Sequence, residues 1–429
     1  MYKILSCVIF GLMVVSLYAQ KKSVPMNDSN TPLHLLRADY TVPYVIPKVA
    51  DVKQALDRIR NYLDSNTPFE MVDKNNKSIS DFSKIDENAS LKKGAFRIVS
   101  YEWGVTYGAM HKVSKITDDT SFKKYADDRL NFIAKVVPSF AENMGRGDDW
   151  ADKGPFRNLL DPKALDDCGA MCTAMIKAKM DGSDAPLQFL IDKHIAYIMT
   201  KEHRLDDGTL ARNRPQPNTV WLDDMYMGVP ALAHMGKMTG EQKYFDEAAR
   251  QILLFGNKMF DHSMGIFYHG WVQSMTDHPQ FHWARANGWA LLTLTEVLDV
   301  LPEKPPDFSA ILSLYKKHVK GLQKYQSGLG FWHQLLNKSD SYLETSATAI
   351  YTYCIAHGIN KGWLDPLAYA PTALLGWNAL FSKINKFGQV EGTCVGTGMA
   401  FDPAFYYHRP VSPYAAHGYG PALLAGAEI

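Results

Sequence analysis

Two adjacent carboxylates, Asp223 and Asp224, lie within the otherwise apolar and aromatic run 221–228. This run predicts the start of a buried helix, where a charged Asp is rare unless it is paired or takes part in chemistry. On a helix the two side chains point about 100° apart, so one can face a pocket while the other pairs elsewhere. Both could instead serve the helix N-terminus, where acidic side chains complement the dipole. The run alone leaves catalysis and capping equally open.

Similar apolar helix starts that carry polar residues recur along the chain. They lie at 101–110, 166–171, 221–228, 283–298, 344–349 and 391–397. Each is followed by further chain that includes an amphipathic stretch, and the units recur roughly every 50 to 65 residues, about six times. A helix that is apolar all round is buried, and its amphipathic partner covers it from outside. The pattern therefore predicts an all-α fold, an (α/α)6 toroid of helical hairpins with short β-hairpins or loops at its rim.

The first residues are organised like a secretory signal peptide. A short basic start at 1–3 is followed by an apolar run at 4–17, too short to span a bilayer, and by the small residue Ala19. We therefore expect residues 1–19 to be cleaved off. The mature protein would be exported, either to the periplasm or out of the cell.

The remaining chain divides into an N-terminal part and a barrel. Residues 20–95 are predicted to form an extended arm and a first helix at 52–63, followed by a polar loop at 64–95. Residues 96–429 are predicted to form the catalytic barrel, on which 52–95 packs as part of one domain.

Composition excludes several classes of partner. The chain carries 46 Lys and Arg against 45 Asp and Glu, so it has no global field that would attract nucleic acid or an anionic membrane. Beyond the signal it has Cys168, Cys172, Cys354 and Cys394. Four cysteines are too few for a disulfide framework and show no zinc-ligand spacing, so buried thiols are expected. We predict no metal and no cofactor, and a monomer or a homodimer.

In such a toroid the starts of the inner helices converge on one end and share a cleft. The residues expected there are Tyr101, Trp103, Asp167, Asp223, Arg285, Glu344 and Thr345, joined by His269, His333 and several Trp rings. Two nearby carboxylates raise the pKa of one of them, which can then donate a proton near neutral pH. Carboxylate pairs flanked by aromatic rings recur in glycoside chemistry, so the cleft favours sugar chemistry over metal chemistry.

These residues also have structural interpretations. Asp167 could cap a helix, and Arg285 could tie two helices together by an ion pair. The aromatic content of 12% suits sugar-stacking platforms, but a Trp-rich helical core would look similar.

Several motifs together resemble glycoside hydrolase family 105, the unsaturated rhamnogalacturonyl hydrolases, and more distantly the family 88 unsaturated glucuronyl hydrolases. They span the chain from residue 95 onward, and together they are specific. The motifs are Tyr101-Glu-Trp-Gly-Val, Asp167-Cys-Gly, Arg212-Asn-Arg-Pro, Trp221-Leu-Asp-Asp-Met, Tyr268-His-Gly-Trp, Trp283-Ala-Arg-Ala-Asn-Gly-Trp, Trp332-His-Gln and Tyr342-Leu-Glu-Thr-Ser. Ala286 stands where many relatives would have Gly, a departure that could alter which leaving sugar is accepted.

The resemblance implies an (α/α)6 barrel and an acidic oligosaccharide substrate that ends in a 4,5-unsaturated uronic acid. It implies that Asp223 is the general acid/base, protonating C4 and then activating water for attack at C5, so that the resulting hemiketal opens and releases the neighbouring sugar. Asp167 matches an assisting Asp, although adjacent Asp166 leaves that register open. Arg285, His269 and Trp289 are candidates to bind the uronate end.

The full set of predicted substrate-binding residues is Tyr101, Trp103, Trp221, His269, Trp283, Arg285, Trp289, Trp332 and His333. Two other functions stay open. The same toroid could carry a polysaccharide lyase or an epimerase, or the protein could be a non-catalytic glycan-binding module.

Overall fold

The computed structural model describes residues 26–36, 45–142, 154–303 and 307–429. The protein chain divides into two compact units, Met1–Val42 and Pro43–Ile429. The described part of the first unit holds one 3-10 helix, η1 (Leu33–Leu35). The predicted signal peptide at 1–19 lies outside the described residues. No described helix has the length and hydropathy to cross a bilayer.

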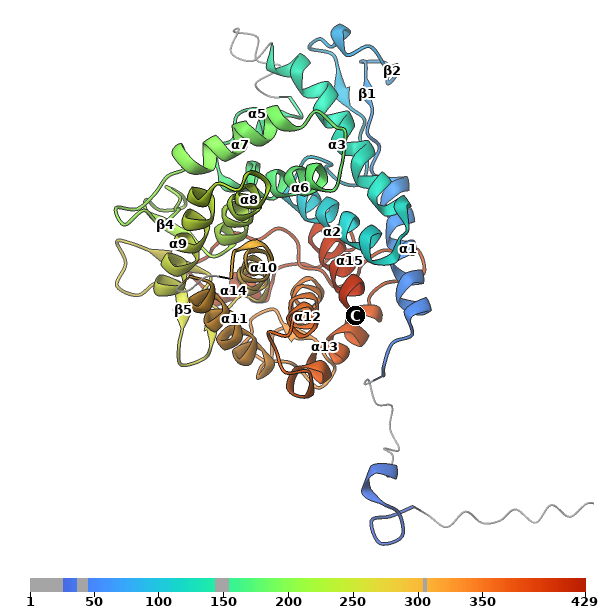
Figure 1. Ribbon diagram of the computed structural model, residues 1–429, viewed down its shortest axis with the longest axis vertical. Coiled ribbons are helices and arrows are strands. Elements are labelled where there is room, and N and C mark those ends of the chain that lie inside the picture. Colours follow the sequence, from blue (N-terminus) through green and yellow to red (C-terminus); the bar gives the residue numbers. More distant parts are fainter. Residues whose placement is uncertain (1–25, 37–44, 143–153, 304–306) are drawn as a thin grey trace, which may run out of the picture. The chain divides into compact units, whose positions relative to one another are not determined.

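Six helices of the second unit form a closed inner ring, in which each packs on the next and the last packs on the first (Figure 1). They are α2 (Tyr101–Thr117), α6 (Gly169–Met180), α8 (Asp223–Thr239), α10 (Ala284–Val300), α12 (Thr345–Asn360) and α15 (Tyr419–Glu428). These helices are buried nearly all round; in α10 every residue from 284 to 298 is buried. A helix without a polar face is stable only inside a protein, which is why these segments form the interior.

Each inner helix is covered by one outer helix. The outer helices are α3 (Thr120–Ala141) on α2, α7 (Gln188–Thr200) on α6, α9 (Gln242–Met259) on α8, α11 (Asp307–Gln323) on α10, α13 (Pro366–Phe381) on α12, and α1 (Val49–Asn66) on α15. Their buried residues fall largely on one face, such as Tyr244, Ala248, Ile252 and Phe255 of α9. The predicted (α/α)6 toroid is confirmed.

The sixth hairpin differs from the prediction. The expected helix start at 391–397 is extended chain, because Gly392 adopts a φ of 71° and Cys394 pairs with Val411 in a β-bridge. The sixth inner helix is instead α15, at the end of the chain, and its outer partner α1 comes from the beginning. The short helix α14 (Pro403–Tyr407) lies between the loop and α15.

Short antiparallel strands occupy the connections. The segment predicted as a loop at 64–95 contains a three-stranded sheet with the order β2-β1-β3, so that prediction was wrong in part. Three two-stranded ribbons lie between later helices: β4 with β7, β5 with β6, and β8 with β9. The strands are β1 (Met71–Val72), β2 (Ser78–Ile79), β3 (Ser90–Leu91), β4 (Thr219–Trp221), β5 (Phe260–Asp261), β6 (Ile266–Phe267), β7 (Gly270–Val272), β8 (Trp332–His333) and β9 (Leu343–Glu344). Runs of two or three residues are too short to show strand periodicity in a sequence.

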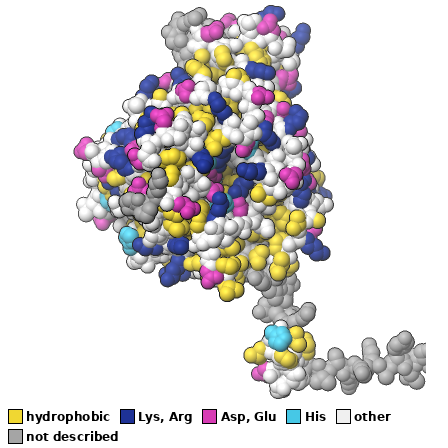
Figure 2. All heavy atoms as spheres, viewed as in Figure 1, with side chains coloured by type: hydrophobic (Ala, Val, Ile, Leu, Met, Phe, Trp, Pro, Cys, Tyr) yellow, Lys and Arg dark blue, Asp and Glu magenta, His cyan; other side chains and the backbone are white. Residues whose placement is uncertain are grey.

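The remaining short elements are η2 (Phe82–Lys84), α5 (Arg157–Leu160), η3 (Leu165–Asp167) and η4 (Ala416–Gly418). On the face drawn in Figure 2, basic and acidic side chains are interspersed, in keeping with the balanced composition. The four cysteines of the described chain are free and buried, as predicted.

The C-terminal halves of the inner helices are joined by buried ion pairs. Glu296 of α10 lies 2.5 Å from Lys177 of α6 and 2.8 Å from His234 of α8. Burial opposes ionisation of Glu296, but Lys177 and His234 outweigh it and lower the pKa of this carboxyl. Burial and the charge of Lys177 lower the pKa of His234. Three neighbouring inner helices are thus linked through one carboxylate.

A second cluster links the other side of the ring. His357 of α12 lies 3.0 Å from Asp299 of α10 and 2.7 Å from Glu428 of α15, and Glu428 also pairs with Lys112 of α2. Burial favours the neutral ring of His357, but its hydrogen bonds to Asp299 and Glu428 outweigh burial and raise its pKa. The imidazolium is therefore the form that stabilises this end of the toroid.

We expect Gly104→Ala to destabilise the fold, because α2 and α6 touch at this point. A Cβ on Gly104 would lie 2.5 Å from the carbonyl carbon and oxygen of Ala170 on α6. Overpacking of this kind lowers the free energy of unfolding by about 1–3 kcal/mol, measurable by urea denaturation. The matched control is Gly108→Ala on the same helix, where the nearest atoms are those of Lys177 at 3.7 and 3.8 Å. That control should gain about 0.5–1 kcal/mol, since Ala is the better helix residue. Equal stability of the two variants would contradict the close contact.

We expect the stabilisation from His357 to depend on pH. Its pKa is raised above the ordinary value of 6.5 in the folded state, so its contribution is complete below 6.5 and is lost as pH rises through the folded pKa. The Tm difference between wild type and His357→Gln should therefore be larger at about pH 6 than at about pH 9. His262→Gln, at an exposed position, is the control and should change Tm little at either pH. A Tm difference for His357→Gln that stays constant with pH would refute this account.

Candidate active site

Asp223 is the first residue of α8 and is separated from β4 by one residue, Leu222. The pairing of β4 with β7 sets Trp221 opposite Gly270, and the backbone N–H of Leu222 donates to the carbonyl of His269 at 2.9 Å. This register brings His269 to the start of α8, where its Nε2 lies 2.9 Å from Oδ2 of Asp223. Asp223 is largely buried, with 9% of its surface exposed.

His269 connects Asp223 to a buried tyrosine. Its Nδ1 lies 2.6 Å from the hydroxyl of Tyr406 on α14, and that hydroxyl accepts the backbone N–H of Ala400 at 3.1 Å. Burial raises the pKa of Tyr406, so its phenol keeps its proton. The hydroxyl then donates to Nδ1, which leaves the imidazole proton on Nε2, directed at Asp223. The result is a chain of hydrogen bonds that ends on one oxygen of the Asp223 carboxyl.

Asp224 is held quite differently. It is 1% exposed and accepts two hydrogen bonds from the guanidinium of Arg212, from Nε at 2.7 Å and from Nη2. Burial raises the pKa of Asp224 to about 6, and the charge of Arg212 opposes that rise. The guanidinium also lies 4.3 Å from the ring of Trp221. Of the two adjacent acids, Asp224 is paired with a guanidinium, whereas the partner of Asp223 is the ring of His269.

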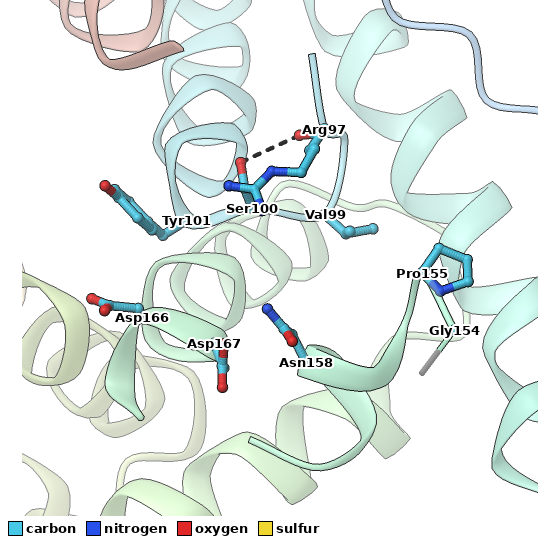
Figure 3. A pocket seen from close by; sticks show the side chains of 9 residues that line it. All are labelled: Arg97, Val99, Ser100, Tyr101, Gly154, Pro155, Asn158, Asp166 and Asp167. Carbon is cyan, nitrogen blue, oxygen red and sulfur yellow. Dashed lines mark hydrogen bonds between the residues drawn. The ribbon is translucent and has the colours of Figure 1, made fainter. Parts of the chain in front are cut away.

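A cavity of about 400 Å³ lies between the start of α2 and η3 and is lined by both Asp166 and Asp167 (Figure 3). Asp166 points in the same direction as Tyr101 and pairs with Arg212 at 3.0 Å, whereas Asp167 turns away. The carboxylate of Asp167 accepts the backbone N–H of Lys163 at 2.9 Å. The structure thus brings Asp166, rather than Asp167, to the Arg212–Asp224 pair, and the assisting role of Asp167 stays a prediction.

Tyr101 stands on the other wall of this cavity. Its hydroxyl lies 2.6 Å from Nε2 of His417, and its ring lies edge-on to Trp289. Burial raises the pKa of Tyr101 well above its usual range, and the charges of Glu102, Asp166 and Asp223 add to the rise. Tyr101 and Asp166 both line this cavity.

Arg285 is held through the two terminal nitrogens of its guanidinium, whereas its buried Nε has no hydrogen-bond partner among the described residues. Its guanidinium donates to the backbone carbonyls of Cys394 and Val395, each at 2.7 Å, and lies 3.9 Å from Glu344. Glu344 in turn caps α12 and accepts the backbone N–H of Cys394. Arg285 therefore fastens the 394–395 loop to α10, and its predicted contact with a uronate stays a prediction.

Comparison with known proteins identifies the chain. The model of Glycosyl Hydrolase Family 88 matches residues 68–429. The chain belongs to this family. It is therefore a glycosidase, and the relationship predicted from the motifs is confirmed.

Relatives of this family 88 enzyme include characterised hydrolases and solved structures. It is 25% identical over 286 residues to the unsaturated rhamnogalacturonyl hydrolase YesR of Bacillus subtilis. This match covers 65% of this chain and 80% of that protein. It is 28% identical over 215 residues to an unsaturated 3S-rhamnoglycuronyl hydrolase of an Alteromonas species, a match that covers 49% of this chain and 50% of that protein. A crystal structure from Salmonella enterica, described as a possible member of the GH105 family, superposes with a TM-score of 0.70 at 21% identity and covers 94% of this chain and 98% of that one. The similarity to this crystal structure shows that the two chains share a fold.

The other predicted binding residues of the family 88 enzyme fall into two groups. Trp283 lies beside His269, with ring centroids 4.8 Å apart, but it is buried, and its predicted contact with substrate stays a prediction. Trp289 is buried and stacks on Tyr226 beneath Tyr101.

The structure does not bring Trp103, Trp332 or His333 to Asp223. Trp103 is fully buried and donates to the hydroxyl of Tyr125 on α3, and Trp332 donates to the carbonyl of Leu322. His333 bonds the carbonyl of Ser341 across the β8–β9 ribbon. The two Trp rings are core residues, the alternative that a Trp-rich sequence leaves open.

Two partners of the site were missed by sequence reasoning. Tyr406 gives no sequence signal, because it contacts His269 from 137 positions away. Asp166 could have been predicted from the sequence, since it is adjacent to the predicted Asp167.

We expect Arg212→Gln to destabilise the enzyme strongly, because it leaves the buried Asp224 without a partner. Breaking such a pair lowers the free energy of unfolding by about 3–5 kcal/mol. Adding Asp224→Asn should recover part of the loss, since a neutral amide needs no cation. Arg157→Gln is the control: its guanidinium is partly exposed and lies 3.8 Å from Asp167, so a change below about 1 kcal/mol is expected. Urea denaturation of wild type and the three variants tests this, and no recovery in the double variant would count against the pairing.

Proposed function

We propose that this enzyme removes a 4,5-unsaturated uronic acid from the non-reducing end of acidic oligosaccharides produced by polysaccharide lyases. The observation that carries the proposal is the unequal treatment of the two adjacent acids. Arg212 neutralises Asp224, while Asp223 has a hydrogen-bonded oxygen, Oδ2, and lies at the start of an inner helix. The names of two relatives, an unsaturated rhamnogalacturonyl hydrolase and an unsaturated 3S-rhamnoglycuronyl hydrolase, support the same substrate class.

The proposed reaction adds water across the double bond. Asp223, protonated at the outset, delivers its proton to C4, and positive charge develops at C5 beside the ring oxygen. The resulting carboxylate then takes a proton from a water molecule as the water oxygen bonds to C5. Asp223 is thereby restored, and the hemiketal formed at C5 opens and releases the neighbouring sugar. One side chain serves as acid and then as base, and no bond at the anomeric carbon is displaced directly.

His269 and Tyr406 position the acid in this scheme. The Nε2–H group of His269 donates to Oδ2 of Asp223, so the transferable proton resides on Oδ1. The hydrogen bond from Tyr406 fixes the tautomer of His269. The same donation stabilises the carboxylate that forms after proton transfer. Both residues are buried, so water does not compete for these bonds.

We also propose that the enzyme is exported and acts together with lyases outside the cytoplasm. The support is the sequence pattern at 1–19. N-terminal sequencing of the protein recovered from the periplasm and from the medium tests this.

We expect Asp223→Asn to abolish turnover while leaving binding intact. The assay follows the ultraviolet absorbance of the conjugated double bond in lyase-digested acidic oligosaccharides, which falls as water adds. Loss of the general acid/base should lower kcat by about 10²–10⁴-fold. Asp166→Asn and Asp167→Asn are matched neighbours, and the larger loss identifies the assisting acid.

Other results would point to the rival functions. A rise in absorbance on intact polymer would mean a lyase and would refute the hydration mechanism. Full activity in Asp223→Asn would remove Asp223 from the reaction. Binding without any change in absorbance across pectic and other acidic digests would favour a glycan-binding module.

A further inference from the structure

A second cavity, of about 270 Å³ and called the rim cavity below, is lined by Arg212 and shares no lining residue with the cavity beside Tyr101. It lies between the segment before η3, the end of α7 and the turn that precedes β4. Apart from Tyr197, the ionisable residues that line it are Lys163, Lys201, Glu202, His203, Arg212 and Arg214. Four of these six side chains are permanent cations, so the lining has the composition of an anion-binding site.

Part of this positive charge is not compensated. Lys163 pairs with Asp161 at 2.6 Å, and Arg212 is neutralised by Asp224 and Asp166. Within the described ranges, neither Lys201 nor Arg214 has a carboxylate partner, and both are exposed. A solvated lysine or arginine on a convex surface would be unremarkable, but here both face one concave space.

Among the described residues, Glu202 is the only carboxyl that lines this cavity. It offsets the positive charge of the cations only weakly. Burial, followed by the charge of Asp224, raises the pKa of Glu202 to about 7. The hydrogen bond from Tyr197, the backbone N–H of His203 and the charge of Arg212 oppose that rise without cancelling it. At mildly acidic pH this carboxyl is therefore largely neutral, and Lys201 and Arg214 dominate the cavity.

One thin wall separates this cavity from the one beside Tyr101. Asp166 lines the first cavity, Arg212 lines the second, and the two side chains bond each other at 3.0 Å. The chain 163–167 forms the rest of the wall, with Lys163 donating its backbone N–H to Asp167. A ligand that extends from the first cavity over this wall reaches the second.

We propose that the rim cavity is an oxyanion subsite for the part of the substrate beyond the bond that is broken. This inference rests on the proposed function: an enzyme that removes the terminal residue has every other anionic group of its substrate on the leaving portion. The group is a sulfate ester or a second uronate carboxylate, since both offer the oxygen acceptors that Lys and Arg bind best. Lys201 and Arg214 bind it, and Arg212 forms the back of the site.

The test compares three oligosaccharides that share the same unsaturated terminal residue. Their leaving portion is neutral, sulfated or uronate-bearing. Steady-state kinetics by ultraviolet absorbance are measured for wild type and for the double variant Lys201→Gln/Arg214→Gln. We expect the double variant to raise KM about tenfold for an anionic leaving portion, equivalent to about 1.4 kcal/mol, and to leave kcat and the KM of the neutral substrate unchanged. The response of the sulfated or of the uronate substrate identifies the group.

The control is Lys316→Gln/Lys320→Gln on α11, which removes the same number of charges at other exposed positions. It should leave all three KM values unchanged, which separates a local site from a general loss of positive charge. Equal KM changes for the three substrates in the rim variant, or none, would overturn the inference.

A binding measurement separates this inference from the hydrolase proposal. Calorimetry uses saturated sulfated and uronate-bearing oligosaccharides, which have no double bond to react. Weaker binding to Lys201→Gln/Arg214→Gln than to wild type supports the subsite even if no substrate is turned over. Turnover by wild type together with unchanged binding refutes the subsite and leaves the hydrolase proposal standing.

Discussion

The guanidinium of Arg212 is the contact on which the arrangement of the site depends. It bonds Asp224 at the start of α8 and Asp166 in η3, and it stacks on Trp221 of β4. Three segments far apart in the sequence are therefore fixed by one planar cation, whose fork of donors suits two carboxylates at once. Without it, three acids would crowd together with no cation between them, and the roles of Asp223 and Asp224 could not differ.

The close approach of the inner helices sets the width of the site. Gly104 on α2 lies against the backbone of Ala170 on α6. Gly169 at the start of α6 lies so close to the carbonyl of Met227 on α8 that an added Cβ would be 1.4 Å from its oxygen. Side chains that leave the first turns of these helices must converge, because the backbones that carry them are in contact. The opposite halves of the helices are held by buried ion pairs, so the ring is tied at two levels.

Much of the fold could be predicted from the sequence, because its signals are local. An apolar segment followed by an amphipathic one is visible within 50 residues, and five of the six hairpins were placed this way. The sixth failed because its inner helix, α15, is only 10 residues long and its partner α1 lies at the other end of the chain. No local sequence pattern predicts that α1 packs on α15.

The site could be predicted less completely, for a related reason. Asp223 and His269 stand in motifs, but whether a buried polar residue faces a cavity or the protein depends on partners from other segments. Arg285 shows this clearly: its guanidinium is occupied by carbonyls more than 100 positions away. Trp103 and Trp332 likewise sit at promising positions but point into the core. Tyr406, which orients His269, belongs to a five-residue helix with no recognisable pattern.

The closure of the ring by α15 has a consequence for biosynthesis. This helix, the last of the six inner helices along the sequence, seals α12 to α2. Until it emerges from the ribosome, the apolar flanks of both neighbours remain uncovered, however complete the preceding five hairpins are. The final step of assembly must therefore follow the synthesis of α15, and a chain that stops before this helix would be an open arc that exposes core surface.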